Sequence, residues 1–230
     1  MQNPLYTIGT PAPLSPDQTQ TWQLPSDCAQ FLQRYGYGSF CDLLTFAEPD
    51  PDFMANNFAD DMDLWTWQSI SADAALAGTQ FAQSIDGDII LAIAHAPAPI
   101  LLLPRHDDKL VLFSMLNQVL DDYVQRYALS SLYFDSHHQA AWHSIEIPER
   151  IQGGARLNTM QALQTTFLAG YAPDAQLSRA QQPQYALHAI GGWVRFDHVY
   201  GSEVVIKYQQ PYAQQALAIG RMLENVIKAA

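Results

Sequence analysis

The feature that most constrains the fold is an apolar stretch, Ile89–Leu103, which is interrupted by a histidine and two prolines. It is too short to span a bilayer, so no transmembrane helix is expected. The runs on either side of the break, Asp88–Ala94 and Ile100–Leu103, have the length and content of buried strands, and the turn dipeptide Asp86-Gly87 opens the first of them. We therefore predict two adjacent antiparallel strands.

Helix and strand signals on both sides of these strands complete an α+β unit. A short amphipathic helix is expected from Pro25 to Tyr35, and Gly36 stands where a left-handed cap residue is wanted. The other predicted elements are a strand at Phe40–Phe46, a helix at Asn56–Ser69, a strand at Lys109–Phe113, a helix from Ser114 to Tyr127, and strands at Leu132–Phe134 and Trp142–Ile147.

The best candidate for a domain boundary is the segment Pro148–Gly154. We predict an extended lead-in at residues 1–22, a main domain at residues 23–150 and a C-terminal α-β-β-α extension at residues 151–230. The fold class is then α+β, an antiparallel sheet with flanking helices plus a small α+β extension. The extension is expected to contain a helix near Asn158–Ala169, a hairpin of Tyr185–Phe196 with Glu203–Tyr208, and a last helix at Pro211–Ile227.

Charge is distributed unevenly along the chain. The 230 residues include 11 Lys and Arg against 23 Asp and Glu, a formal net charge of −12. Residues 1–150 hold 5 bases and 19 acids, a net charge of −14, whereas residues 151–230 hold 6 bases and 4 acids, a net charge of +2. This balance argues against a nucleic-acid binder, which needs a basic surface to neutralise phosphates. It favours a basic protein partner for the first 150 residues.

Signals of catalysis or export are weak. The sequence contains no phosphate-binding loop, nucleophile elbow or zinc-protease motif, so neither an enzyme nor a cofactor is expected. The N-terminal residues have no basic residue or apolar segment of the kind found in a secretory signal, which favours the cytoplasm. Cys28 and Cys41 lack paired spacing and are expected to be buried small residues in a reducing compartment.

The densest cluster of metal-ligand residue types is Asp135, His137, His138 and His143. These side chains have the chemistry to bind zinc or iron if a loop brings them together. Their spacing does not place two imidazoles on one helical face, so a solvated histidine-rich turn is favoured and no metal site is assigned. A metal-dependent hydrolase built on this cluster is kept as a third functional hypothesis.

Three aspartates, Asp60, Asp61 and Asp63, precede two tryptophans, Trp65 and Trp67. As paired carboxylates for acid–base or magnesium chemistry they lack a partner motif at defined spacing. Carboxylates beside an aromatic residue are typical of a recognition surface, although helical or strand spacing must point at least one tryptophan into the core. The predicted partner-binding residues are Asp60, Asp61, Asp63 and Trp65, with Glu48, Asp50 and Asp52 as the rim.

The order of short motifs resembles the SMI1/KNR4 (SUKH) superfamily. Leu24-Pro25-Ser26-Asp27 leads a helix containing Phe31-Leu32, Tyr35-Gly36-Tyr37-Gly38-Ser39-Phe40 enters a strand, and Asp86-Gly87-Asp88 precedes an apolar strand. In that family a Leu-Pro-x-x-aromatic helix precedes a glycine-containing turn, and a later Gly-Asp turn precedes an inner strand. The resemblance covers Leu24–Tyr127, with two departures: Cys28 replaces the usual aromatic residue, and Ile89–Ile93 lacks one.

The resemblance implies a binding module and not a catalyst. Bacterial members of the family resemble immunity proteins, which bind and neutralise the toxin domains of polymorphic or contact-dependent toxin systems, many of them nucleases. This predicts a cytoplasmic bacterial immunity protein that occludes a cationic toxin with its acidic surface. The alternative is a regulatory or scaffold module that recruits a cellular protein, as eukaryotic relatives do.

Overall fold

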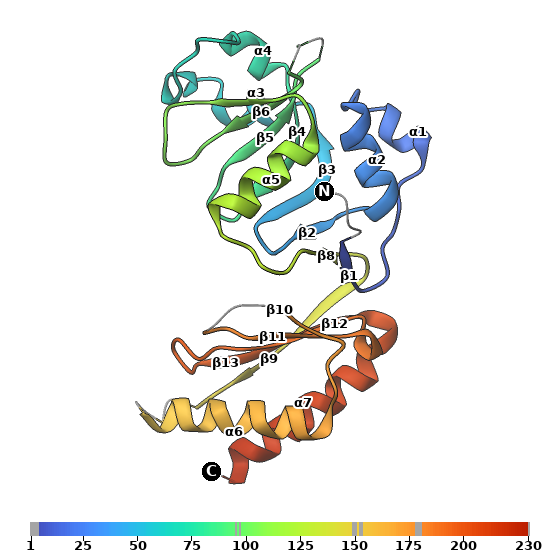
Figure 1. Cartoon of the computed structure of the whole chain (residues 1–230), viewed down its shortest axis with the longest axis vertical. Helices are drawn as coiled ribbons and strands as arrows, with labels where there is room; N and C mark the ends of the chain where they lie inside the picture. The colour runs from blue at the N-terminus through green and yellow to red at the C-terminus, as the bar shows by residue number, and fades with distance from the viewer. Residues whose placement is uncertain are drawn as a thin grey trace. The chain divides into compact units, whose positions relative to one another are not determined.

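The computed structural model describes residues 5–94, 96, 98–148, 151, 154–177 and 181–229. Within these residues, helices flank two sheets, a mostly antiparallel sheet of eight strands and an antiparallel sheet of five (Figure 1). The chain divides into two compact units: unit 1 comprises Met1–Tyr6 and Pro11–His137, and unit 2 comprises Thr7–Thr10 and His138–Ala230. The predicted α+β class is confirmed.

Unit 1 is built around the eight-stranded sheet, whose order is β1-β8-β2-β3-β4-β5-β6-β7. The predicted strand pair is confirmed as β5 and β6, which are antiparallel with Ile89 opposite Leu103. The elements of this part of the chain are β1 (Tyr6–Ile8), α1 (Pro16–Gln20), α2 (Ser26–Tyr35), β2 (Gly38–Phe40), β3 (Leu44–Asp50), α3 (Phe53–Phe58), the 3₁₀ helix η1 (Met62–Leu64), α4 (Ala72–Leu76), β4 (Thr79–Ser84), β5 (Ile89–Ala92), β6 (Ile100–Leu103), β7 (Val111–Phe113), α5 (Leu116–Arg126) and β8 (Tyr133–Ser136).

Both faces of this sheet are apolar and covered. Directly paired residues of neighbouring strands point to the same face. Phe46, Ala82 and Ile90 are consecutive cross-strand partners and define one face. Leu91 and Leu101 pair with each other on the opposite face, where the segment containing α3, η1 and α4 packs against them.

Helix α2 covers the first of these faces, as its amphipathic pattern predicts. The Phe31 ring lies 4.6 Å from the ring of Phe46 and 5.5 Å from that of Phe134. The helix ends at Tyr35, and the cap residue Gly36 has a φ of 69°, which suits glycine, and donates its N–H to the Leu32 carbonyl. The sequence signals for both the apolar face and the end of α2 are therefore confirmed.

The Gly-Asp turn before β5 is joined to helix α5 by a buried carboxylate. Asp88 Oδ2 accepts hydrogen bonds from the Tyr123 hydroxyl at 2.6 Å and from Arg126 Nη1 at 3.2 Å, and Oδ1 accepts from the Arg105 N–H at 3.0 Å. Burial, and then the bond to Asp88, raise the pKa of Tyr123. At the residue that follows α5, a hydrogen bond to Asp86 raises the pKa of Tyr127 to about 12.

The predicted helix at Asn56–Ser69 is wrong. The segment instead contains the end of α3, the 3₁₀ helix η1 and an extended backbone at Trp65, with φ of −124° and ψ of 149°. Aspartate side chains compete with helical backbone hydrogen bonds, so Asp60 and Asp61 in the middle of the pattern disfavour a continuous helix.

The predicted strand at Phe40–Phe46 is in fact a hairpin of β2 and β3. Cys41 and Asp42 have positive φ values of 53° and 55° and form the turn between the two strands. Strand β4 was not predicted, although it pairs with both β3 and β5 and so lies inside the sheet.

Unit 2 is built around the five-stranded sheet, whose order is β10-β11-β12-β13-β9. Helices α6 and α7 pack on one face of it, and Phe167, Val194, Ile206 and Leu223 are among the fully buried residues of this core. The elements are β9 (Ala140–Glu146), α6 (Gly154–Gly170), β10 (Ala175–Leu177), β11 (Gln184–Leu187), the 3₁₀ helix η2 (His188–Ile190), β12 (Gly192–Phe196), β13 (Glu203–Gln209), the 3₁₀ helix η3 (Gln210–Tyr212) and α7 (Ala213–Ala229).

The boundary between the units lies earlier than predicted. Strand β9, which we assigned to the domain at residues 23–150, pairs along its whole length with β13 of the C-terminal part. The change of unit therefore falls between His137 and His138, and not in the Pro148–Gly154 segment. A strand's partner can lie far along the chain, so a Pro- and Gly-rich segment alone does not locate a boundary.

The stability of unit 2 is expected to depend on pH through a half-buried histidine, His198. His198 Nε2 lies 2.6 Å from Gln164 Oε1, and Gln164 in turn donates to the Tyr185 hydroxyl at 2.6 Å. Burial lowers the pKa of His198, partly opposed by Asp197. Because the folded-state pKa is depressed, neutral His198 contributes stability that is present above the unfolded value of about 6.5 and is lost as pH falls through the folded value.

We expect the His198 Cε1 proton to titrate in NMR spectra with a midpoint below about 6.5, the value of an unperturbed histidine. The variant His198→Gln, which keeps a polar side chain, should make the unfolding of unit 2 less sensitive to pH between about 5 and 7. A midpoint at or above the unperturbed value would contradict this prediction.

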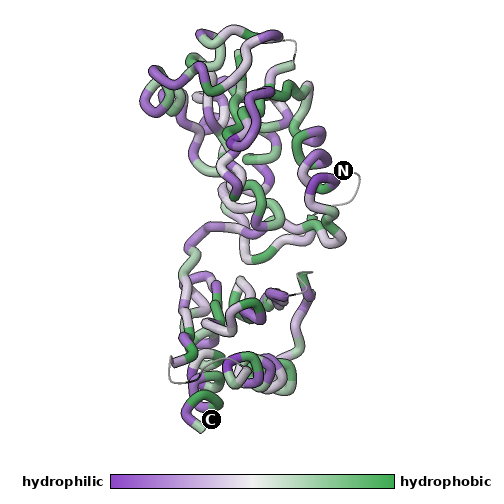
Figure 2. Tube along the Cα trace, turned by 90° about the vertical axis from the view of Figure 1, so that its left-hand side faces the viewer, coloured by the Kyte–Doolittle hydropathy of each residue, from purple (hydrophilic) through white to green (hydrophobic). Residues whose placement is uncertain are grey.

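The hydropathy-coloured trace in Figure 2 alternates between hydrophobic and hydrophilic residues along both units. Among the residues that the structure describes, none of the helices has both the length and the apolar character needed to cross a membrane.

Candidate partner-binding surface

Acidic residues greatly outnumber basic residues in unit 1. By sequence, unit 1 contains 4 Lys and Arg against 17 Asp and Glu, a net charge of −13, whereas unit 2 contains 7 against 6, a net charge of +1. Between Arg34 and Arg105 there is no Lys or Arg and there are ten carboxylates. All ten are described, and seven of them are exposed: Glu48, Asp52, Asp60, Asp61, Asp63, Asp73 and Asp86.

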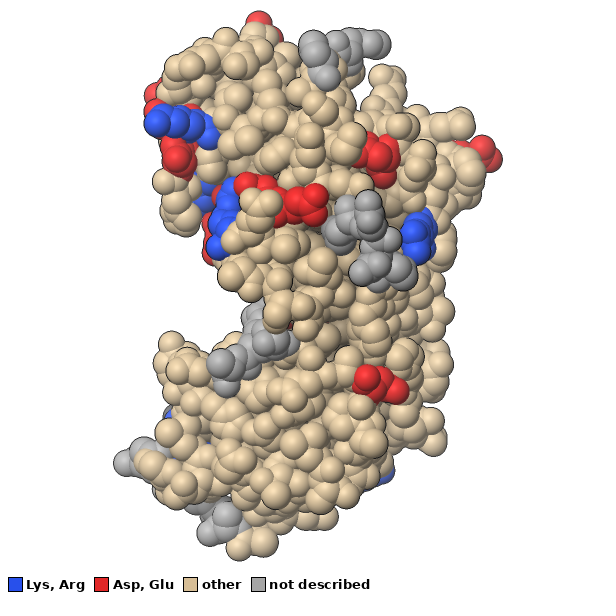
Figure 3. Space-filling view, viewed as in Figure 1, with Lys and Arg blue, Asp and Glu red and all other residues tan. Residues whose placement is uncertain are grey.

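Figure 3 shows one face of the molecule. On the part of it that belongs to unit 1, the carboxylates form several groups, and the few basic side chains lie beside some of these groups. On this face the negative charge is therefore divided among several groups. The net charge of −13 gives unit 1 a long-range negative field.

Asp60, Asp61 and Asp63 are exposed, as the sequence analysis expected for a recognition surface. They lie between α3 and Trp65, in the segment that covers one face of the sheet. The backbone there is compact, because the Asp61 N–H donates to the Phe58 carbonyl at 3.0 Å and the Leu64 N–H donates to the Asp61 carbonyl at 3.1 Å.

Trp65 was predicted to be a surface residue, but it is a core residue. Only 6% of it is exposed, and its ring lies 5.5 Å from that of Phe58 and 6.2 Å from that of Trp67. Its indole N–H donates to the Pro104 carbonyl at 3.0 Å. Trp65 thus anchors the acidic segment, residues 60–63, to the core of unit 1. It is not part of the exposed surface.

The turn that contains Asp107 and Asp108 is hydrogen-bonded to Thr66, which lies just after the three aspartates. The Thr66 N–H donates to the Asp108 carbonyl at 2.8 Å, and the Thr66 hydroxyl donates to Asp108 Oδ2 at 2.8 Å. This hydroxyl bond is the main reason why the pKa of Asp108 is lowered. Asp107 and Asp108 therefore lie next to the 60–66 segment, together with the exposed basic residues of the same turn, Arg105 and Lys109.

Two of the three predicted rim residues, Glu48 and Asp50, belong to strand β3. Strand β3 continues to Asp50, with its register shifted between Phe46 and Asp50, where Pro49 is buried. A shifted register accommodates a proline that lacks an N–H. Glu48 and Asp52 are exposed, and Asp50 is half-buried and accepts a hydrogen bond from the Asp52 N–H at 2.9 Å.

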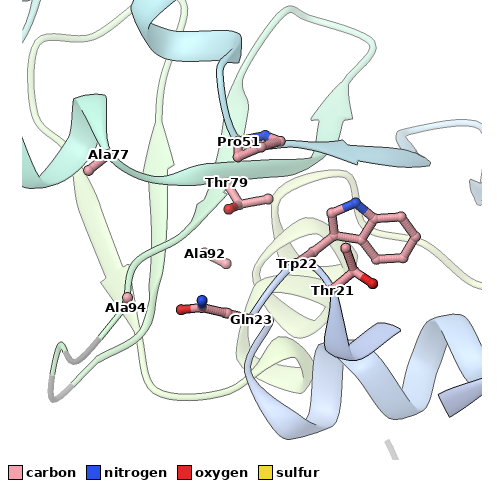
Figure 4. Close-up of a pocket in the computed structure, with 8 residues that line it drawn as sticks. All are labelled: Thr21, Trp22, Gln23, Pro51, Ala77, Thr79, Ala92 and Ala94. Atoms are coloured by element: carbon pink, nitrogen blue, oxygen red, sulfur yellow. The ribbon is translucent and has the colours of Figure 1, made fainter. Parts of the chain in front are cut away.

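Unit 1 also contains a cavity that was not predicted from the sequence. It has a volume of about 210 Å³ and is lined by Thr21, Trp22, Gln23, Pro51, Ala77, Thr79, Ala92 and Ala94 (Figure 4). The lining comes from the loop between α1 and α2, from the end of β3, and from β4 and β5 with their flanks. No local motif signals it, because residues far apart in the sequence create it.

The histidine-rich cluster does not form a metal site in the described residues, where no three His, Cys, Asp or Glu side chains are grouped as ligands. His143 Nε2 on β9 lies 3.8 Å from Glu224 Oε1 on α7. Cys28 and Cys41 are buried as expected, and burial raises the pKa of the Cys28 thiol.

Comparison with protein-family models, with curated proteins and with solved structures found no match to this chain.

Proposed function

We propose that this chain is an immunity protein: unit 1 binds a cationic toxin domain, most simply a nuclease, and blocks its access to substrate. The observation that carries the proposal is the separation of charge, a net −13 on unit 1 against +1 on unit 2. The proposal places this encounter in the cytoplasm, where a cell must protect its own nucleic acids.

Electrostatics supports a protein partner with a basic surface. A nuclease must hold phosphates, so its active site is commonly lined by Lys and Arg. A strongly negative surface increases the rate of encounter with such a site and disfavours partners of the same charge. The −13 charge of unit 1 is of the sign and size that this mechanism needs.

The family resemblance narrows the partner from any cationic protein to a toxin. The elements that correspond to its motifs are helix α2 with the cap at Gly36 and the Gly-Asp turn before β5. Their order supports the SUKH assignment that we propose, and the toxin-neutralising role follows from that assignment.

The proposed mechanism is stoichiometric and involves no bond making or breaking. Carboxylates of Asp60, Asp61 and Asp63 form charge-assisted hydrogen bonds to Lys and Arg of the toxin. The Trp65 and Thr66 hydrogen bonds fix the backbone of this segment before binding, which lowers the ordering entropy lost on association. The toxin is inhibited because the bound chain occupies the space that its substrate needs.

The proposal is tested by co-expression with the toxin domain encoded beside the gene for this chain. We expect rescue of cell growth and a 1:1 complex in size-exclusion chromatography. As a control, unrelated acidic proteins of similar size should not rescue growth. Absence of both rescue and complex would contradict the immunity role. A complex with a non-toxic cellular protein, without rescue from any neighbouring toxin, would favour the regulatory or scaffold alternative.

A further inference from the structure

The cavity of unit 1 has small residues as its floor and an aromatic ring as one wall. Thr79 and Ala92 are directly paired across β4 and β5, so both side chains point to the same face of the sheet. Alanine side chains at positions 77, 92 and 94 leave the space open. In Figure 4 the Trp22 ring stands on one side of this space, and the Gln23 side chain extends under Ala92.

The loop that carries Trp22 and Gln23 is held by its own hydrogen bonds. The Thr21 hydroxyl donates to the Asp17 carbonyl at 3.2 Å, and the Gln23 N–H donates to the Gln20 carbonyl at 3.3 Å. Gln23 has a φ of 51°, which is uncommon for a residue other than glycine. These contacts leave Trp22 only half-buried. The loop therefore presents the indole beside the cavity instead of packing it into the core.

The size and lining of the cavity suit one long side chain. Its volume of about 210 Å³ is smaller than the roughly 300–1,000 Å³ of pockets for drug-sized ligands. The alanine floor can contact methylene groups, and the indole of Trp22 can stack on a planar cation. The Gln23 amide oxygen and the Thr79 hydroxyl oxygen supply hydrogen-bond acceptors.

The charges near the cavity favour a cationic side chain as its occupant. Pro51 lines the cavity and is flanked in the chain by Asp50 and Asp52, of which Asp52 is exposed. The stretch between Arg34 and Arg105, which supplies five of the lining residues, contains no Lys or Arg to oppose a cation. Arginine is favoured over lysine because its guanidinium is planar and can stack while it donates several hydrogen bonds.

We infer that this cavity receives an arginine side chain of the cationic partner. The inference rests on the proposed function, because it takes the partner to be a basic protein. It assigns Trp22, Gln23 and Thr79 to the interface, and none of them was predicted from the sequence.

The test is an NMR titration of the full chain at low salt with N-acetyl-arginine amide as the probe. N-acetyl-citrulline amide, which is neutral and nearly the same shape, is the matched comparator. We expect saturable shifts of the Trp22 indole and of the Thr79 and Ala92 amide signals with the arginine probe, and much smaller shifts with the citrulline probe. Trp22→Leu should weaken the binding about fivefold, as expected for the loss of a cation–π contact.

Trp142→Leu is the control variant, because Trp142 is 57% exposed on β9 of unit 2, and it should leave the titration unchanged. Ala92→Leu, which fills the cavity, provides a second test that does not depend on the indole. Absence of saturable shifts, or equal shifts with the citrulline probe, would overturn the inference. The test does not involve the toxin, so a chain that binds the arginine probe but forms no toxin complex would contradict the proposed function and not this site.

Discussion

Replacing Asp88 with alanine is expected to lower the free energy of unfolding of unit 1 by about 3 kcal/mol, which corresponds to a fall in Tm of about 10 °C. Asp88 is 4% exposed and accepts hydrogen bonds from the Tyr123 hydroxyl, the Arg126 guanidinium and the Arg105 N–H. Its removal leaves the buried hydroxyl and the N–H without their acceptor, and an unsatisfied buried donor is costly.

Asp122→Ala is the matched control for this prediction. Asp122 pairs with the same arginine, at 2.6 Å, but both side chains are more than a third exposed. An exposed ion pair contributes about 0.5 kcal/mol or less, so Tm should hardly change. Asp88→Asn, which keeps an acceptor oxygen, should fall between the two variants. Thermal unfolding followed by circular dichroism, with hydrogen exchange of α5 amides to identify unit 1, checks the order. Equal effects of Asp88→Ala and Asp122→Ala would contradict it.

The sequence predicted those elements whose pattern is local and regular. Helix α2 has its apolar residues at helical spacing and a glycine cap, and β5 and β6 are short apolar runs between turn residues. Strand β4 escaped prediction because its residues include Gln80 and Ser84, which are polar but buried at 8% and 6% exposure. Burial on both faces of the sheet removes the alternation of polar and apolar residues by which a strand is recognised.

The candidate surface was predicted only in part, because its geometry depends on contacts between distant residues. Exposure of Asp60, Asp61 and Asp63 follows from their charge. The link between their segment and Asp108 does not follow from charge, because it requires the hydrogen bonds of Thr66 between two separate turns. The same applies to Trp65: its ring and its indole N–H find partners at Phe58 and Pro104, and spacing alone did not reveal which of the two tryptophans is buried.

Reversing the charges of Asp60, Asp61 and Asp63 to lysine is expected to slow association with the toxin about 10- to 100-fold at low salt. The three side chains are exposed on a segment fixed by Trp65 and Thr66, so the substitutions change the surface field without removing a buried contact. The difference from the unaltered chain should shrink as salt rises, because screening shortens the range of the field. Stopped-flow mixing at several salt concentrations measures both effects.

The control for this prediction reverses three other exposed carboxylates, Asp17 on α1, Asp121 on α5 and Glu146 on β9. It changes the net charge of the chain by the same amount but leaves the segment between α3 and Trp65 unaltered. If only the total charge of the chain matters, the two triple variants will associate at equal rates, and the 60–63 segment is then not the binding surface. If the segment is the surface, its reversal should slow association more strongly and also speed dissociation, because direct contacts are lost.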